Sequence, residues 1–435
     1  MHEHHDHAPL LRNTRKTECG ASGSLASLEV RAAPFALLTR RALFSTAISG
    51  ALLSPRALAQ NAPDMAARFR QMSAEYERKG LAEPFKGITA NGTVEPDLFG
   101  IHSTGVSTAP VRNAAVRFLA SLTPEQRGRT MFAVDDPEWR KWMNQHFYVR
   151  QGVSFQEMTE AQRSAAFGLL AASLSARGLK LTRNIMRLNE TLAELTNDHR
   201  FLGEWLYFIT VMGKPSASEP WGFQLDGHHA IVNYFVLGDQ VVMTPFFAGS
   251  EPVTAPSGKY KGLSILQDEQ NRGLDMLLAL DGAERAKAIL NPHKTRNYNL
   301  TEAFQDNVVL DYAGAHAADF PAPRRKQLLD LVELYAGNMD DGHARIKMDE
   351  VERHLDRTWF AWIGGSDDSS VYYYRIHSPV ILIEFDHQRP ANLARFAKDP
   401  SLPTRQHIHC VVRTPNGNDY GKDLLRQHYQ SHAHT

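Results

Sequence analysis

Apolar positions recur with helical spacing through the first half of the chain after residue 60. Residues 64–80 carry apolar side chains at intervals of three and four and end at a glycine, a typical helix stop. Two later segments open with Thr-x-x-Gln, at Thr123 and at Thr159, which is the pattern of a capping box. We therefore predict helices over 64–80, from Thr123, over 159–178 and over about 180–195.

From residue 205 the pattern changes to short runs rich in Val, Ile, Phe, Tyr and Thr, which are typical of strands. Two such runs flank Leu237-Gly238-Asp239-Gln240, a hairpin signal. Helical spacing returns over 263–290 and 324–335, and the strand-like runs "TWFAWIG", "SVYYYRIHSPVILIEFDH" and "QHIHCVVRTP" follow.

This order of elements predicts an α+β fold. We expect a helical N-terminal half packed on a mixed or antiparallel sheet, which is assembled from residues about 203–250 and 358–415. Residues 60–435 contain no linker-like stretch, so we expect them to form a single domain.

The composition limits the partners. Lys and Arg number 48, as do Asp and Glu, so the net charge gives no reason to expect nucleic acid as a partner. The only cysteines are Cys19 and Cys410, and Cys19 falls in a segment that we expect to be removed. An internal disulfide is then not expected, and Cys410 is predicted to be a buried structural thiol.

Residues 39–60, "TRRALFSTAISGALLSPRALAQ", join a twin arginine, a modest apolar stretch and an Ala-x-Ala end. This order predicts a twin-arginine signal peptide, with residues 1–59 as the leader and the export machinery as a partner. The protein is then expected to be periplasmic or secreted. The apolar stretch, residues 42–53, is too short for a stable membrane span. The alternative is an internal amphipathic helix that happens to begin with two arginines.

The pair His407 and His409 is the strongest local sign of chemistry. On a strand, residues two apart face the same way, so both imidazoles could reach one ion. The alternative is a polar pair on an edge strand. Upstream, Glu384 and Asp386 share one face of an apolar strand, and a carboxylate buried there must be paired or bind a cation. Glu384 could instead form a salt bridge with Arg375 or Arg413.

The sequence "QLDGHHAIVNYFV" supplies two further histidines. If it were one strand, His228 and His229 would face opposite sides. We predict His228 as the third nitrogen ligand and His229 as a neighbouring or substrate-contacting group. A bulge at Gly227 would exchange the two roles.

These residues suggest one divalent ion, with Zn favoured and Fe, Cu or Mn as alternatives. We expect a small-molecule substrate and a metal-activated water, hence a hydrolase. The alternatives are an Fe- or Cu-dependent oxidoreductase or oxygenase, and a non-catalytic periplasmic binding protein with an aromatic cleft over 221–247 and 372–374. The candidate residues are, as metal ligands, His228, Glu384, His407 and His409; as catalytic residues, Glu384, His229 and Arg375; and as substrate contacts, Arg413, Trp221 and Gln224.

Several blocks of the chain resemble a family of exported bacterial and fungal proteins known as the domain of unknown function 3500 family. The similar blocks are "FLASLTPEQR", "MTEAQRSAAFGLLAASLSARG", "PWGFQLDGHHAIVNYFVLGDQVVMTPFFAGSEP", "YYYRIHSPVILIEFD", "HIHCVVR" and "DYGKDLLRQHY". They follow in order along the part of the chain after the leader. The resemblance implies a family-wide architecture and implies no particular reaction.

Overall fold

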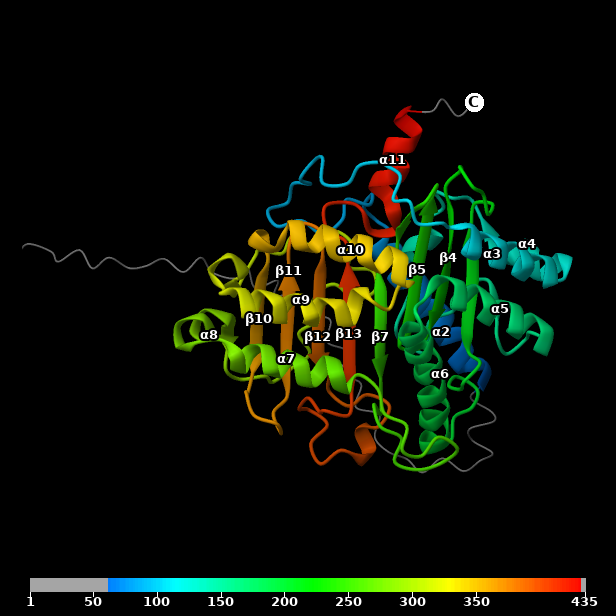
Figure 1. Ribbon diagram of the computed structural model, residues 1–435. Coiled ribbons are helices and arrows are strands. Elements are labelled where there is room, and N and C mark those ends of the chain that lie inside the picture. Colours follow the sequence, from blue (N-terminus) through cyan, green and yellow to red (C-terminus); the bar gives the residue numbers. More distant parts are fainter. Residues whose placement is uncertain (1–61, 432–435) are drawn as a thin grey trace, which may run out of the picture. The chain divides into compact units, whose positions relative to one another are not determined.

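The computed structural model describes residues 62–431, so the expected leader, residues 1–59, lies outside the described part of the chain. A large mixed sheet runs through this part (Figure 1). The first group of its strands comes from the middle of the chain: β3 (Tyr207–Met212), β4 (Trp221–Gly227), β5 (Ala230–Leu237), the short β6 (Gln240–Val242) and β7 (Phe246–Ser250). The second comes from the C-terminal part: β10 (Trp359–Gly364), β11 (Tyr372–His377), β12 (Leu382–His387) and β13 (Ile408–Arg413).

The two groups meet where β7 pairs with β13, antiparallel, with Gly249 opposite His409. The strand order is β1-β3-β4-β5-β7-β13-β12-β11-β10-β8, and only the β1–β3 and β10–β8 pairs on this path are parallel. The short strands are β1 (Met131–Phe132), β2 (Val153–Ser154), β8 (Ile289–Asn291) and β9 (Ala315–His316). The predicted α+β class and the assembly of the sheet from two distant parts of the sequence are confirmed.

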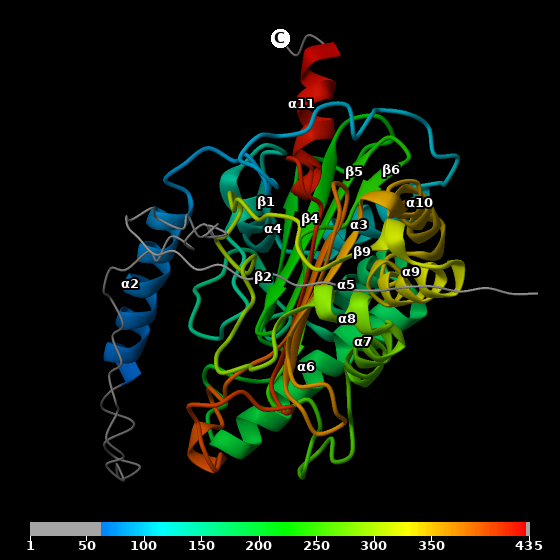
Figure 2. The ribbon, with the colours of Figure 1, turned by 90° about the vertical axis from the view of Figure 1, so that its left-hand side faces the viewer.

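Helices lie on both sides of the sheet. Helices α6 (Ala176–Thr196), α7 (Gln267–Ala279), α9 (Ala322–Ala336) and α10 (Asp341–Arg353) cover one face, which is turned to the viewer in Figure 1. The edge-on view of Figure 2 places α2 (Ala62–Gly80) on the other side. The remaining helices are α3 (Ala109–Ser121), α4 (Pro124–Thr130), α5 (Glu160–Ser173), α8 (Gly282–Ala288) and α11 (Lys422–Ser431). No helix among residues 62–431 is long and apolar enough to cross a membrane.

Both predicted capping boxes are present, at Thr123 and at Thr159. The helix predicted over 159–178 ends earlier than expected. Helix α5 ends at Ser173, and Gly178, its predicted end, belongs to α6. The reason is Ser175, whose hydroxyl accepts a hydrogen bond from the Gly178 N–H and starts a new helix. Gly178 itself packs against Asn338, whose carbonyl oxygen would lie 2.1 Å from an added Cβ.

Strand β13 separates two kinds of side chain. Ile408, Cys410 and Val412 belong to the large apolar core that also contains residues of α6, α7 and α9. Cys410 is buried and unpaired, as expected for a structural thiol. The alternate residues, His409 among them, therefore face the side on which α2 lies. The candidate chemistry is on this second face of the sheet.

Candidate metal centre

His407 and His409 face the same side, as the two-residue spacing predicted. Their Nε2 atoms lie 3.0 Å apart, and their rings are nearly perpendicular, at 83°. His409 lies within β13, and His407 immediately precedes the strand. Both side chains are almost fully buried, at 4% and 5% relative exposure.

The third member of the cluster is His229, not His228. Its Nε2 lies 3.0 Å from Nε2 of His409 and 3.3 Å from Nε2 of His407. Zinc bonded to nitrogen at about 2.0–2.1 Å with tetrahedral angles holds its ligand atoms about 3.3 Å apart. The three nitrogens are therefore within about 0.3 Å of the spacing that one such ion requires, and the group could hold a metal ion.

Backbone geometry decides between the two adjacent histidines. They do not continue a strand, because they form the two-residue turn between Gly227 and Ala230. His229 takes a φ of 65° there, and its carbonyl accepts a hydrogen bond from the Gly249 N–H at 2.9 Å. Gly227 stays in continuous register with Tyr207 on β3 and with Ala230 on β5, so there is no bulge at this position. The absence of a side chain leaves room for the Tyr207 ring, which would lie 2.1 Å from an added Cβ. The turn, and not a bulge, gives His229 the ligand position.

His228 is held by a different partner. Its Nδ1 lies 2.8 Å from Oδ1 of Asn189, and its ring stacks on His229 with 4.0 Å between the centroids. The ring of His146 also contacts the ring of His228, edge-on, with 5.6 Å between the two centroids. His228 thus supports the ring of His229 and is not part of the three-nitrogen group, which corrects the predicted ligand set.

Gly249 makes the cluster possible, because it lies on β7 between the turn and β13. A Cβ at this position would lie 2.6 Å from the Ile408 carbonyl oxygen and 3.2 Å from Cδ2 of His229. Only a glycine leaves room for the imidazole of His229 to cross β7 and reach His409. Gly249 can be seen in the sequence, within "FFAGSEP", but the strand pattern alone does not show that a glycine is needed at this position.

The tautomer of His407 follows from its surroundings. Nδ1 lies 2.7 Å from the carbonyl oxygen of Arg389, which can only accept, so Nδ1 carries a proton and, in the neutral ring, the lone pair is on Nε2. The carboxylate of Glu251 holds that loop in place, accepting the N–H groups of Ala391 and Asn392 at 2.7 and 2.8 Å. Orientation by a backbone carbonyl is the usual support of a metal-binding histidine.

His409 is oriented by a carboxylate. Its Nδ1 donates to Oε1 of Glu302 at 2.6 Å, so its Nε2 lone pair is directed at the other two rings. Burial raises the pKa of Glu302 to about 7, while the nearby His407 and a hydrogen bond from Asn144 act in the opposite direction. The sequence reasoning missed Glu302 and Glu251, because both lie outside the strand pairs that spacing could relate to the histidines.

The cluster suits a cation. Burial lowers the pKa of His229 and of His409 well below its usual value, and the neighbouring histidines add to the effect. These two rings therefore stay neutral, and their Nε2 lone pairs, about 3 Å apart, repel one another unless a cation lies between them. Neutral imidazoles are ligands for Zn, Cu, Fe and Ni.

Glu384 does not belong to this group, which is a second correction. Its carboxylate is fully buried and accepts hydrogen bonds from Leu300 N–H, Thr301 N–H and Tyr373 Oη at 2.8–2.9 Å, and from the hydroxyl of Thr301. Four donors occupy its lone pairs, so none is left for an ion. The expected alternative, a salt bridge to Arg375 or Arg413, is not among the ion pairs of residues 62–431 either.

Asp386 lies directly opposite His409 on β12 but is occupied in the same way. It accepts from Lys294 Nζ at 2.5 Å and from the Tyr298 N–H at 2.7 Å. Glu384 and Asp386 together therefore anchor residues 294–301, the segment that leads into Glu302. The paired carboxylates recognised in the sequence hold the loop whose next residue orients His409.

The other predicted site residues are structural. Arg413 is fully buried and donates to Asp419 and Asp306 at 2.7 and 2.6 Å. Arg375 is buried and donates to the carbonyl of Asp311. Trp221 and Gln224 lie inside β4, where Trp221 belongs to the apolar core and the Gln224 amide donates to Asn233 and to the Trp139 carbonyl. The binding-protein alternative expected an aromatic cleft that includes residues 372–374. These described residues do not form one, because all three tyrosines are at most 2% exposed.

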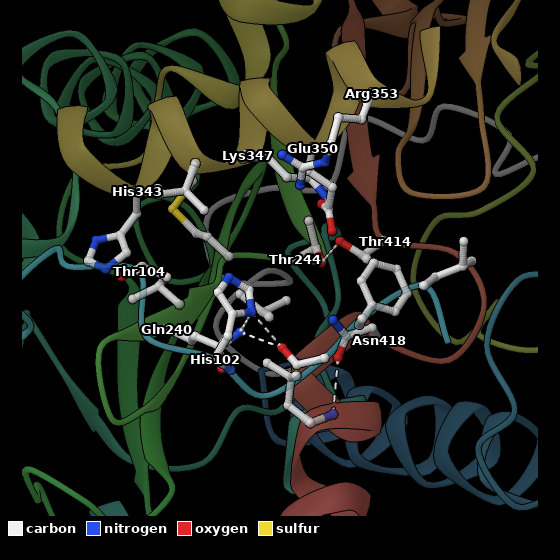
Figure 3. Close-up of a pocket in the computed structure, with 18 residues that line it drawn as sticks. His102, Thr104, Gln240, Thr244, His343, Lys347, Glu350, Arg353, Thr414 and Asn418 are labelled. Carbon is white, nitrogen blue, oxygen red and sulfur yellow. Dashed lines mark hydrogen bonds and ion pairs between the residues drawn. The ribbon is translucent and has the colours of Figure 1, made fainter. Parts of the chain in front are cut away.

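A separate cavity of about 130 Å³ lies beyond the opposite ends of β5 and β13 (Figure 3). Helix α10 contributes His343, Lys347, Glu350 and Arg353 to its wall, as the figure shows. Both ring nitrogens of His343 are engaged, with Asp340 and with the Asp239 carbonyl, and Lys347 is paired with Glu350 at 2.6 Å. His343, Lys347 and Glu350 already have protein partners, so we place the candidate chemistry at the three histidines.

Comparisons with known proteins identify a family and give no function. A family model described as "Protein of unknown function (DUF3500)" matches residues 104–422, which include the whole histidine cluster and its supporting carboxylates. No curated protein and no solved structure matches the chain.

Proposed function

The chain belongs to the DUF3500 family, and because the description of that family gives no activity, we propose from the site itself that the protein is a zinc-dependent hydrolase. One Zn²⁺ would be held by His229, His407 and His409. The observation that carries the proposal is the convergence of three buried Nε2 atoms at 3.0–3.3 Å from one another.

Three protein ligands are the number found in catalytic zinc sites, which keep a fourth position for water or substrate. When bound, the ion would supply a water whose pKa falls to about 7. The chain's own contribution is orientation. The Arg389 carbonyl and the Glu302 carboxylate fix the Nδ1–H groups of two ligands, and Gly249 admits the third.

The position of Glu384 argues against an iron-dependent oxidoreductase or oxygenase as the alternative. A mononuclear iron site of the common kind uses two histidines and one carboxylate. The carboxylate expected for that role, Glu384, is occupied by four protein donors and lies outside the group. Three imidazoles remain compatible with copper, so metal analysis decides between the two chemistries.

The test is the metal content and the hydrolytic activity of protein folded in the cell. We expect about one zinc per chain, and hydrolysis of a substrate panel that ceases on chelation and returns with zinc. The variants His407→Asn and His409→Asn keep an N–H donor near the position of Nδ1 but remove Nε2, so both should lose the metal. His102→Asn, at an exposed histidine outside the three-nitrogen group, is the control and should keep it.

Three results would overturn the proposal: a metal content near zero, copper or iron in place of zinc, or hydrolysis that does not depend on the metal. Retention of the metal by His409→Asn, or its loss from His102→Asn, would refute the ligand assignment.

We also propose that the protein is exported to the periplasm by the twin-arginine route, on the basis of residues 39–60. Replacing Arg40 and Arg41 by lysine should leave the uncleaved protein in the cytoplasm, as cell fractionation would show. Unchanged export of that variant would contradict the assignment.

A further inference from the structure

A cavity of about 400 Å³ opens beside Glu302, the residue that orients His409. Its polar lining consists of four side-chain amides, one phenol and one carboxylate, from Asn144, Gln145, Asn299, Gln305, Tyr76 and Glu302. The remainder of the described lining is apolar. Cavities that bind small molecules measure about 300–1,000 Å³, so this one can take a small ligand.

The amides in this wall point to a ligand that both donates and accepts hydrogen bonds. Each amide offers two donor hydrogens and an acceptor oxygen, a combination that matches hydroxyl groups. No hydrogen bond joins the side-chain amides of Gln145 and Gln305 to another residue of the described chain, and both residues are exposed. They are therefore free to bind a ligand without breaking a protein contact.

The aromatic ring at the rim adds an apolar surface. Tyr76 is 41% exposed, and Leu300, which also lines the cavity, is 45% exposed. An exposed phenol ring offers a flat face to C–H groups as well as a polar tip. A ligand that presents hydroxyls at its edge and C–H groups on its face would match both parts of the cavity.

Charge argues against an ionic ligand. None of the described lining residues is Lys, Arg or His, so an anion would meet no compensating cation. The nearby Arg150 is already paired with Asp226 and donates to backbone carbonyls. The single carboxylate, Glu302, accepts from His409 Nδ1 through Oε1 at 2.6 Å and from the Asn144 amide through Oε2 at 3.5 Å, so each of its oxygens already has a protein donor.

We propose that this cavity, bounded by Tyr76, Gln145, Gln305 and Glu302, binds a neutral polyhydroxylated ligand, a mono- or disaccharide. This binding goes beyond the hydrolase proposal, because it needs no metal. Glu302 contacts both the cavity and His409, so the saccharide and the ion would bind on either side of one side chain.

The experiment compares sugars that differ in charge, with the whole protein and with detection by saturation-transfer NMR and calorimetry. The neutral probes are glucose, cellobiose and N,N′-diacetylchitobiose, and the charged probes are glucuronate and glucosamine. We expect at least one neutral probe to bind and both charged sugars to bind about tenfold more weakly or not at all. Gln145→Ala and Gln305→Ala should each weaken binding about tenfold, whereas Gln71→Ala, an exposed residue of the same helix as Tyr76, should leave it unchanged.

The proposal is overturned if no neutral probe binds at up to roughly 10 mM, if a charged sugar binds more tightly, or if the two cavity variants bind like wild type. Repeating the titration after chelation separates the two proposals. Saccharide binding that persists in metal-free protein supports the cavity assignment even if zinc-dependent hydrolysis fails, and binding that disappears with the metal refutes it.

Discussion

Replacing Glu302 by glutamine tests whether the carboxylate supports a metal ion through His409. The amide oxygen can still accept the Nδ1–H, so the metal-free fold should be preserved while the charge is lost. Loss of such an orienting partner typically weakens metal binding 10- to 100-fold. The expected effect is therefore on the stabilisation by zinc and not on the stability of the metal-free protein.

The size of the effect follows from linkage. Zinc at 1,000 times its Kd stabilises the folded state by about 4.1 kcal/mol, and the same concentration would stabilise the variant by about 1.4–2.7 kcal/mol. For about 370 ordered residues, at about 2.1 cal/mol/K per residue, the unfolding entropy is about 0.8 kcal/mol/K. Zinc should then raise the Tm of the wild type by about 5 °C and that of Glu302→Gln by only about 2–3.5 °C.

Scanning calorimetry in a zinc buffer and in chelator measures both quantities. His407→Asn serves as the reference without a complete site and should show little rise in Tm with zinc. If Glu302→Gln gains as much from zinc as the wild type does, Glu302 is not coupled to the ion. If His407→Asn also gains the full 5 °C or so, zinc stabilises the protein from another site and the ligand assignment fails.

Three further predictions concern the framework. Glu384→Gln should lower the free energy of unfolding by about 2–4 kcal/mol in urea titration, because an amide nitrogen would face buried donors; a loss below about 0.5 kcal/mol would contradict that account. Gly249→Ala should weaken zinc binding at least tenfold by displacing His229, while Gly168→Ala, with open space around its Cα, should not; equal zinc affinity in the two variants would contradict the steric argument. Burial raises the pKa of Glu138 to about 8 in the folded protein, above its unfolded value near 4.5. The folded state therefore binds more protons between about pH 4.5 and 8, and this group makes stability fall with rising pH by up to about 1.4 kcal/mol per unit. Glu138→Gln should reduce that slope in urea titrations at pH 5–8, and an unchanged slope would refute the assignment.

The sequence allowed the class of fold and one half of the candidate site to be predicted. Strand alternation placed His407 and His409 on a common face, because the side-chain period of a strand is a local property. The same alternation brought Glu384 and Asp386 to that face. It could not show that residues 294–301 approach from a distant part of the chain and occupy both carboxylates with hydrogen bonds.

The choice between His228 and His229 depended on a turn that the strand pattern concealed. A histidine with a φ of 65° is uncommon, and the run of apolar residues after it favoured a continuous strand. The need for Gly249 could not be predicted either, because it arises from a contact between β7 and the ring of His229, which is a property of the packed sheet. Local pattern thus identified the residue types, and tertiary packing determined which nitrogen atoms converge.

The cluster joins parts of the chain that are far apart in sequence, since His229 and His409 are separated by 180 residues. An ion bridging them in the unfolded chain would have to close a loop of that length, at a cost of about 5 kcal/mol in chain entropy. The N-terminal part of the sheet contributes one ligand and β13 completes the set, so a chain that has not yet paired β7 with β13 has no complete site. Metal content would then report the completion of folding, and uptake of the ion would be among the last steps in the maturation of this protein.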